Sequence, residues 1–190
     1  MAHIAGDRGH GTGRIVGAGV MQPILTLGYR PHLIAETIGL HLAYYAPVWG
    51  FGQVFEAKLA GELGDFFQRF DDTRDAVLSI RDPEGPTVAT LFIDGAIAGR
   101  DDARLRWFIT AARVRGQGLG RRLMQAACAH LDQTGVACTY LTTFAGLDPA
   151  RHLYEAFGFT LALETETDPW GGGVREQRFE RVCGSRKPTP

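Results

Sequence analysis

The sequence predicts an α/β (α+β) fold built as a single domain. Apolar residues recur at the spacing of helices in four segments, and they alternate or run continuously in seven shorter, β-rich segments interspersed with the helical ones. A chain of 190 residues has the ordinary size of one domain with a substantial core. Neither an internal repeat nor a linker divides the chain. The domain is therefore expected to span residues 20–182.

The first 70 residues are expected to hold one strand and two helices. Residues 21–27 form the strand, and turn residues lead into a helix over residues 32–45, which Pro47 and Gly50 end. From 51 to 70, apolar residues then recur at intervals of three and four residues, which predicts a second helix. Its other faces are expected to carry the charged residues Lys58, Glu62, Asp65 and Arg69.

The middle of the chain begins with a predicted β-hairpin. Strands over residues 75–81 and 87–94 are joined by the turn sequence Asp82-Pro83-Glu84-Gly85-Pro86. A third strand is expected over residues 103–110, followed by a glycine-rich loop and a helix over residues 116–134. The core stripe of that helix is expected to be Leu119, Leu123, Ala126, Ala127, His130 and Leu131.

The last part of the chain predicts a strand over 136–143, a helix over 149–157, and strands over 159–164 and 174–181. The complete order is then β-α-α-β-β-β-α-β-α-β-β. The remaining ends, residues 1–19 and 183–190, are expected to be flexible tails.

Composition excludes several classes of protein. A formal charge of −1 and a pI near 6.6 argue against nucleic acid or an anionic membrane as the main partner. No apolar run reaches the roughly 18 residues of a membrane span. The three cysteines lack metal-ligand spacing, and an odd number suits reduced thiols in the cytoplasm, so we expect a cytoplasmic protein without a metal.

The segment from Arg115 to Met124 reads RGQGLGRRLM and joins a strand to a helix. Glycines let a backbone approach an anion closely, and the first N–H groups of a helix have no partner inside the helix. Such a loop is a device for binding phosphate. A Walker loop needs Lys followed by Ser or Thr where this chain has Arg121-Arg122, and the dinucleotide fingerprint needs glycine at 121. A plain turn that starts a helix is the alternative.

Two motifs resemble the hallmarks of the GNAT superfamily of N-acetyltransferases. The first is Arg-x-x-Gly-x-Gly, carried by Arg115, Gly118 and Gly120, which looks like the loop that binds the pyrophosphate of acyl-CoA. The second is the segment 150–159, ARHLYEAFGF, which looks like the short helix with Leu-Tyr that ends at Gly-Phe. The resemblance covers at least residues 86–181. Segments 143–147 (TFAGL), 163–164 (LE) and 170–171 (WG), with the aromatic run over 44–56, look similar to the acetyltransferase half of bacterial MarR–GNAT fusion proteins.

The resemblance implies the acyl-CoA N-acyltransferase fold, with a mixed central sheet splayed between its middle strands and helices on both faces. It also implies acetyl-CoA as co-substrate. The main chain of Phe108, Ile109 and Thr110 would pair with the pantetheine arm. The pyrophosphate would lie on the loop formed by Arg115, Gly116, Gln117, Gly118, Leu119, Gly120 and Arg121. Arg113, Arg121 and Arg122 are each a candidate to bind the adenosine 3′-phosphate. The equal alternative is that these arginines are only solvated and bind no ligand.

The resemblance places Tyr154 at the general-acid position of the family. A phenol is protonated at neutral pH and can protonate the departing thiolate. A tyrosine that only packs under the cofactor is the alternative. The strand over 103–110 carries no acid that could serve as general base. Glu56, His41, and a water held by Thr142 and Thr143 are the candidates, with a solvated Glu56 and a core His41 as the simpler interpretations.

The expected reaction moves an acetyl group to a primary amine of a small molecule or amino-acid-like acceptor, by direct attack in a ternary complex. Candidate walls for the acceptor are the aromatic residues Tyr44, Tyr45, Trp49, Phe51, Phe55 and Trp170, although such clusters more often form core. The competing hypothesis is a non-catalytic acyl-CoA-binding regulatory module. A homodimer is a further hypothesis, with the strand 174–181 and the exposed aromatic residues as candidate contacts.

Overall fold

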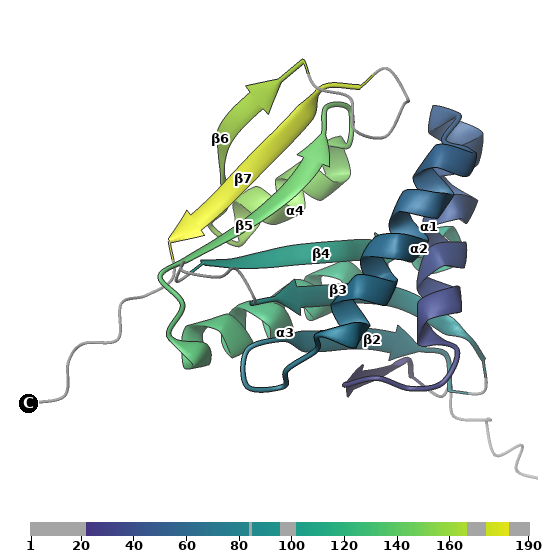
Figure 1. The fold of residues 1–190 in the computed structure, drawn as a ribbon, viewed down its shortest axis with the longest axis horizontal. Helices are drawn as coiled ribbons and strands as arrows, with labels where there is room; N and C mark the ends of the chain where they lie inside the picture. Colours follow the sequence, from purple (N-terminus) through teal and green to yellow (C-terminus); the bar gives the residue numbers. More distant parts are fainter. Residues whose placement is uncertain (1–21, 84, 96–101, 167–173, 183–190) are drawn as a thin grey trace, which may run out of the picture.

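The computed structural model describes residues 22–83, 85–95, 102–166 and 174–182, shown in Figure 1. The expected tails, together with Trp170 and Cys183, lie outside these residues. The elements are β1 (Ile24–Leu27), α1 (Leu33–Trp49), α2 (Gln53–Gln68), β2 (Ala76–Arg81), β3 (Thr87–Asp94), β4 (Asp102–Thr110), a 3-10 turn (Ala112–Val114), α3 (Leu119–Thr134), β5 (Cys138–Phe144), α4 (Asp148–Ala156), β6 (Thr160–Thr165) and β7 (Glu176–Val182). Their order is the predicted one.

The strands form one seven-stranded sheet in the order β1-β2-β3-β4-β5-β7-β6. Every neighbouring pair is antiparallel except β4 and β5, which are parallel. That parallel pairing runs only from Asp102 opposite Cys138 to Leu105 opposite Leu141. Beyond it the two strands diverge, as Figure 1 shows. The predicted mixed sheet that opens between its middle strands is therefore confirmed.

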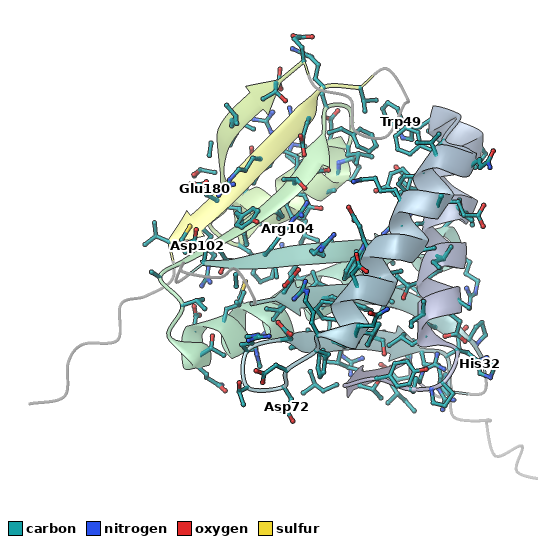
Figure 2. The ribbon with its side chains drawn as sticks, viewed as in Figure 1. His32, Trp49, Asp72, Asp102, Arg104 and Glu180 are labelled. Atoms are coloured by element: carbon teal, nitrogen blue, oxygen red, sulfur yellow. The ribbon has the colours of Figure 1, made fainter. Side chains whose placement is uncertain are left out.

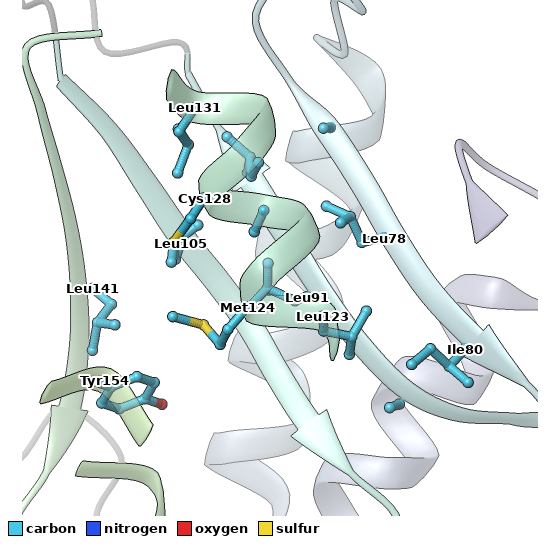
Figure 3. Close-up of a cluster of buried hydrophobic side chains, with 14 of the residues drawn as sticks. Leu78, Ile80, Leu91, Leu105, Leu123, Met124, Cys128, Leu131, Leu141 and Tyr154 are labelled. Carbon is cyan, nitrogen blue, oxygen red and sulfur yellow. The ribbon is translucent and has the colours of Figure 1, made fainter. Parts of the chain in front are cut away.

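Helices cover both faces of the sheet. On one face α3 and α4 bury a mainly aliphatic cluster against β2 to β5, of which Figure 3 shows a large part. On the other face α1 and α2 bury an aromatic cluster that includes Phe66, Phe92 and Trp107. The ring centroids of Phe66 and Trp107 lie 5.4 Å apart, in edge-on geometry. Strand β4 therefore lies between two apolar layers and contributes residues to both.

A β-bulge interrupts β4 at Trp107. The register against β3 shifts between Thr90 and Phe92, and Trp107 has a φ of 48°, in the left-handed region. As a result two consecutive side chains lie on the α2 face: Trp107 packs on Phe66, and Arg106 pairs with Glu62. Nothing in the sequence pattern marks this position, because the residue is neither glycine nor asparagine.

Helix α1 extends further than predicted, through Pro47 to Trp49. A proline removes one backbone donor, which the last turn of a helix tolerates when neighbouring bonds remain. Here the Gly50 N–H donates to the Ala46 carbonyl at 3.0 Å, and Gly50 has the left-handed φ of 67° that often ends helices. Helix α3 in turn begins at Leu119 rather than at 116, which leaves the glycine loop outside it.

Candidate active site

A cavity of about 120 Å³ lies where β4 and β5 diverge. Its walls come from α1, α2, α4 and the middle strands of the sheet. The polar and charged groups that line it are His41, Tyr45, Lys58, Glu62, Arg104, Arg106, Thr142, Thr143 and Tyr154. Figure 2 shows Arg104 at the start of the divergence. The splay of the sheet therefore creates an internal site that reaches from the α2 face to α4.

Tyr154 reaches this cavity from α4. Its ring lies between β4 and β5 in Figure 3 and packs on Phe108 and Phe179 at centroid distances of 6.1 Å and 5.9 Å. Its hydroxyl makes no hydrogen bond to any residue that the structure describes. Burial, and to a lesser degree the neighbouring Tyr45, raises the pKa of Tyr154 above its ordinary value. The phenol is therefore protonated at neutral pH and is available to a group in the cavity.

The glycine loop lies at the end of β4 and opens α3. Gly116 and Gly118 have φ values of 77° and 75°, which side chains rarely adopt, and Gly118 is the N-cap of α3. No side chain caps this helix, so the N–H groups of its first turn have no partner within the helix. At Gly120 an added Cβ would lie 3.3 Å from Phe108 Cζ, so glycine there lets α3 pack closely on β4. The loop can accept an anion.

Two of the basic residues around the loop are already engaged by the protein. Arg113 forms an ion pair with Asp82, and Arg122 Nη1 donates to the Pro23 carbonyl at 2.8 Å. Both side chains are exposed. These contacts occupy donors of both guanidinium groups.

The other two arginines of the loop contact only aromatic rings. The Arg115 guanidinium lies 4.3 Å from the centroid of Tyr44, and that of Arg121 lies 5.6 Å from the centroid of Phe157. Neither makes an ion pair or a side-chain hydrogen bond with a described residue. Arg121 follows the loop directly on the first turn of α3. It is the basic side chain on that turn that is free to meet a ligand.

The α2 side of the cavity carries a network of charges. Glu62 accepts from Arg106 Nη2 at 2.6 Å and from Lys58 at 2.8 Å, and Arg106 Nη1 also reaches Asp94 at 3.2 Å. Burial opposes ionisation of Glu62, but the two cations outweigh it and hold the pKa of Glu62 below its ordinary value. Glu62 is therefore ionised and fully paired, which makes it a weak base.

Arg104 belongs to the same side of the sheet but has no acidic partner among the described residues. Its Nη2 donates to Thr142 Oγ1 at 2.5 Å, and the guanidinium lies 5.8 Å from the Tyr140 ring. Its Nε is buried without a partner. Burial, together with the positive charge of Arg106, lowers the pKa of Arg104. Guanidinium nevertheless remains protonated in proteins.

His41 faces the cavity from α1 and is only 6% exposed. Its Nδ1 lies 2.8 Å from the Thr37 carbonyl. A carbonyl can only accept, so Nδ1 carries the proton and Nε2 keeps a lone pair. Burial lowers the pKa of His41 to about 4, although the hydrogen bond to Thr37 opposes this. The ring is neutral at pH 7.

Glu56 does not reach this cavity. It is exposed on α2, whereas the lining residues of that helix, Phe55, Lys58, Leu59 and Glu62, follow a spacing of three and four. Glu56 is not among these residues, so the cavity gives no support to Glu56 as the general base, and that role stays a prediction. Lys58 and Glu62 lie outside the buried stripe of α2, as expected, but both line the cavity, which the sequence did not indicate.

The expected aromatic walls are mostly core. Tyr45 and Phe55 line the cavity, but Phe51 is 2% exposed and buried among rings, and Tyr44 and Trp49 pack on the same cluster. Sequence reasoning also overlooked Arg104 and Arg106 as cavity residues. Their alternation on β4 with buried Ala103 and Leu105 was the available signal, since alternate residues of a strand share one face.

Comparison with known proteins gives a family and a fold. The model of the acetyltransferase (GNAT) family matches residues 61–159, just over half of the chain. No curated protein matches. None of the described helices is both long enough and apolar enough to cross a membrane.

Solved structures match along most of the chain at low identity. A protein from Desulfovibrio desulfuricans assigned to the GNAT acetyltransferases has a TM-score of 0.67 at 16% identity, covering 85% of this chain and 99% of that one. Spermidine N-acetyltransferase from Vibrio cholerae, in complex with CoA and spermine, has a TM-score of 0.64 at 18% identity, covering 83% and 95%. The ribosomal-protein-S18-alanine N-acetyltransferase of Escherichia coli has a TM-score of 0.61 at 18% identity, covering 88% and 99%. At identities this low, the matches show that the fold is shared and nothing beyond the fold.

Proposed function

Because this chain belongs to the acetyltransferase (GNAT) family, we propose that it is an acetyl-CoA-dependent N-acetyltransferase that acts on a primary amine of a small molecule. One observation carries the proposal. The Tyr154 hydroxyl, which bonds to no described residue, faces a cavity between diverging strands, and a glycine loop that opens α3 without a side-chain cap follows the same β4. A thioester with a pyrophosphate tail matches both features. The family uses acetyl-CoA as its acetyl donor.

The donor would lie along the open edge of β4. Residues Thr90 and Ala89 of β3 pair with Ile109 and Thr110 on one side, and no described strand pairs with the other side of residues 106–110. The main chain of Phe108, Ile109 and Thr110 can therefore hydrogen-bond the pantetheine amides as an added strand would. The N–H groups from Gly116 to Arg121 would hold the pyrophosphate, and the side chain of Arg121 would be left for the 3′-phosphate.

The chemistry is direct transfer between two bound substrates. The amine nitrogen attacks the thioester carbonyl carbon, a C–N bond forms, and the C–S bond breaks. The departing thiolate takes the proton of the Tyr154 hydroxyl, and the proton left on nitrogen returns to the phenolate directly or through water. A main-chain N–H of residues 108–110 would stabilise the oxyanion. The products are the amide and CoA with a free thiol.

Removal of the first proton from the ammonium needs no strong base at mildly alkaline pH. An alkylammonium has a pKa of about 10.4, and a cationic cavity lowers it. The groups that face the cavity and can accept this proton are His41 through Nε2 and a water on Thr142 or Thr143. We assign the role to water held by the threonines, which would pass the proton on to bulk solvent, because burial disfavours the protonated form of His41. Glu56 is not assigned this role, because it does not line the cavity.

The acyl-CoA-binding regulatory module is the second candidate. The observation that favours it is the absence of any unpaired carboxylate among the described cavity residues. Similarity to the acetyltransferase half of MarR–GNAT fusion proteins is compatible with either function and is part of the proposal. The two candidates differ in turnover, not in binding.

The first test is binding of acetyl-CoA by calorimetry, with desulfo-CoA and ATP as comparison ligands. Gly118→Trp would place a ring over the N–H groups of the loop. Gly135→Trp is the matched control, since Gly135 caps the other end of α3 with a φ of 78° and open space around it, as Gly118 has 75° and open space. Both variants carry similar backbone strain. Micromolar binding that only Gly118→Trp loses supports the donor site.

A screen of amine acceptors then separates the two functions. Release of the CoA thiol that depends on an amine, with formation of the acetylated product, supports the transferase. Binding of acetyl-CoA without turnover on any amine favours the regulatory module. A folded protein that binds no acetyl-CoA rejects both.

A further inference from the structure

The unpaired arginine of the cavity restricts what the acceptor can be. The charged residues that line the cavity are Lys58, Arg104, Arg106 and Glu62. Glu62 is shared between Lys58 and Arg106, and Asp94 supplies Arg106 with a second anion. Arg104 forms no ion pair with a described residue, although the negative charges of Glu62 and Asp94 also act on it. A half-buried guanidinium without a directly bonded carboxylate is costly, and a bound anion would lower that cost.

The guanidinium is also aimed toward the reacting end of the cavity. In the parallel register Arg104 lies opposite Tyr140, yet its Nη2 donates to Thr142, two residues further toward the open end. Two residues of strand correspond to about 7 Å. The side chain thus leans along the opening in the sheet toward the level of Trp107 and Phe108. Its Nε and Nη1 make no hydrogen bond to a described residue.

We infer that Arg104 binds a carboxylate of the acceptor, so that the substrate class is a small molecule with both an amine and a carboxylate, such as an amino acid. This inference rests on the proposed N-acetyltransferase function. Guanidinium binds carboxylate through paired, charge-assisted hydrogen bonds. The same excess of positive charge disfavours a polyamine, whose ammonium groups would meet Arg104, Arg106 and Lys58.

The distance along β4 limits the acceptor to a small molecule. Trp107 lies three positions after Arg104, about 10 Å at the rise of a strand, and the lean of the guanidinium shortens the gap that the acceptor must bridge. The amine and the carboxylate of an amino acid are separated by one carbon atom. An acceptor of that size fits a cavity of about 120 Å³.

The test compares L-amino acids with their carboxamides as acceptors, with spermine as a polycationic probe. Arg104→Gln removes the charge, and Arg104→Lys keeps it without the planar fork. Arg178→Gln is the matched control, because Arg178 lies on the same Tyr140 ring at 3.9 Å but pairs with Glu180 and does not line the cavity. Acetyl-CoA affinity is measured on every variant, which separates the donor site from the acceptor site.

The expected result is a preference for amino acids over carboxamides in the unmodified protein. In Arg104→Gln the KM for the amino acid rises about 100-fold, while the KM for the carboxamide and the affinity for acetyl-CoA do not change. Arg104→Lys recovers part of the loss, and Arg178→Gln behaves as the unmodified protein. Equal effects of Arg104→Gln on amino acid and carboxamide, or a preference for spermine, would overturn the inference while leaving the transferase intact.

Two further outcomes also test whether Arg104 binds a carboxylate of the acceptor. If the acetyl-CoA-loaded protein neither acetylates nor binds an amino acid of the panel, the carboxylate assignment is rejected and donor binding stands. If acetyl-CoA itself does not bind, the proposed function fails and the acceptor inference fails with it.

Discussion

The Thr90 hydroxyl donates a hydrogen bond to the Trp107 carbonyl at 2.8 Å, across the bulge that separates the two halves of β4. Thr90 is fully buried, and Trp107 has the left-handed φ of 48°. The contact holds the irregular residue in place. It thereby sets the direction in which residues 108–110 leave the bulge.

Thr90→Val should therefore destabilise the protein and weaken its donor site. The substitution keeps the shape of the side chain but leaves the Trp107 carbonyl without this donor, which costs about 1–3 kcal/mol. Chemical denaturation measures the loss, and calorimetry with acetyl-CoA measures the effect on residues 108–110. Thr90→Ser keeps the hydroxyl and should behave nearly as the unmodified protein. Equal stability of the Val and Ser variants would show that this hydrogen bond does not maintain the bulge.

Arg121 is predicted to recognise the 3′-phosphate of CoA. It makes no ion pair with a described residue, whereas Arg113 is held by Asp82. Arg121→Gln should reduce affinity for CoA about tenfold or more and leave affinity for 3′-dephospho-CoA unchanged. Arg113→Gln is the control with the same change of charge. A loss that is equal for both ligands would place Arg121 elsewhere on the donor.

Tyr154→Phe should lower turnover by about 100-fold or more without changing acetyl-CoA affinity. The phenyl ring keeps the contacts with Phe108 and Phe179 but cannot protonate the thiolate. Because burial raises the pKa of Tyr154, the unmodified enzyme should keep this acid protonated, and its activity should not fall as pH rises to about 10. Steady-state rates from pH 7 to 10 check both statements. Unchanged turnover in the variant would leave Tyr154 as a packing residue.

The fold was predictable because its signals are local. The order of elements, the hairpin, and the loop that opens α3 follow from periodicity, turn residues and glycines, each read within a few residues of sequence. Tyr154 also belonged to a short motif. Its position in a cavity between β4 and β5 is what the structure adds.

The charges of the cavity were not predictable in the same way. Arg104 and Arg106 differ only in which acids approach them, and those acids come from α2 and from the end of β3. Glu56 and Glu62 are both acids of α2, and which of them lines the cavity depends on the face that α2 packs against the sheet. The bulge at Trp107 likewise follows from pairing with β3 rather than from the residue itself.

His41 predicts a specific loss of stability in acid. Its pKa is lowered from 6.5 to about 4 in the folded protein, whereas the unfolded chain keeps the ordinary value. Above about pH 6.5 the ring is neutral in both states and contributes nothing to pH dependence. Between about pH 6.5 and 4 the unfolded state binds a proton that the folded state does not, so stability falls as pH falls. Below about pH 4 the loss levels off at about 3 kcal/mol.

The matching variant is His41→Asn, whose amide can still donate to the Thr37 carbonyl but does not titrate. It should be less stable than the unmodified protein at pH 7, because it fills less of the buried site, and the difference should shrink as pH falls to 4.5. Urea denaturation at several pH values measures this convergence. Paired acids such as Asp94 and Glu62 also have lowered pKa values and lose stability in acid, but they do so equally in both proteins. A constant difference between the two proteins would therefore show that His41 titrates normally and is hydrated in solution.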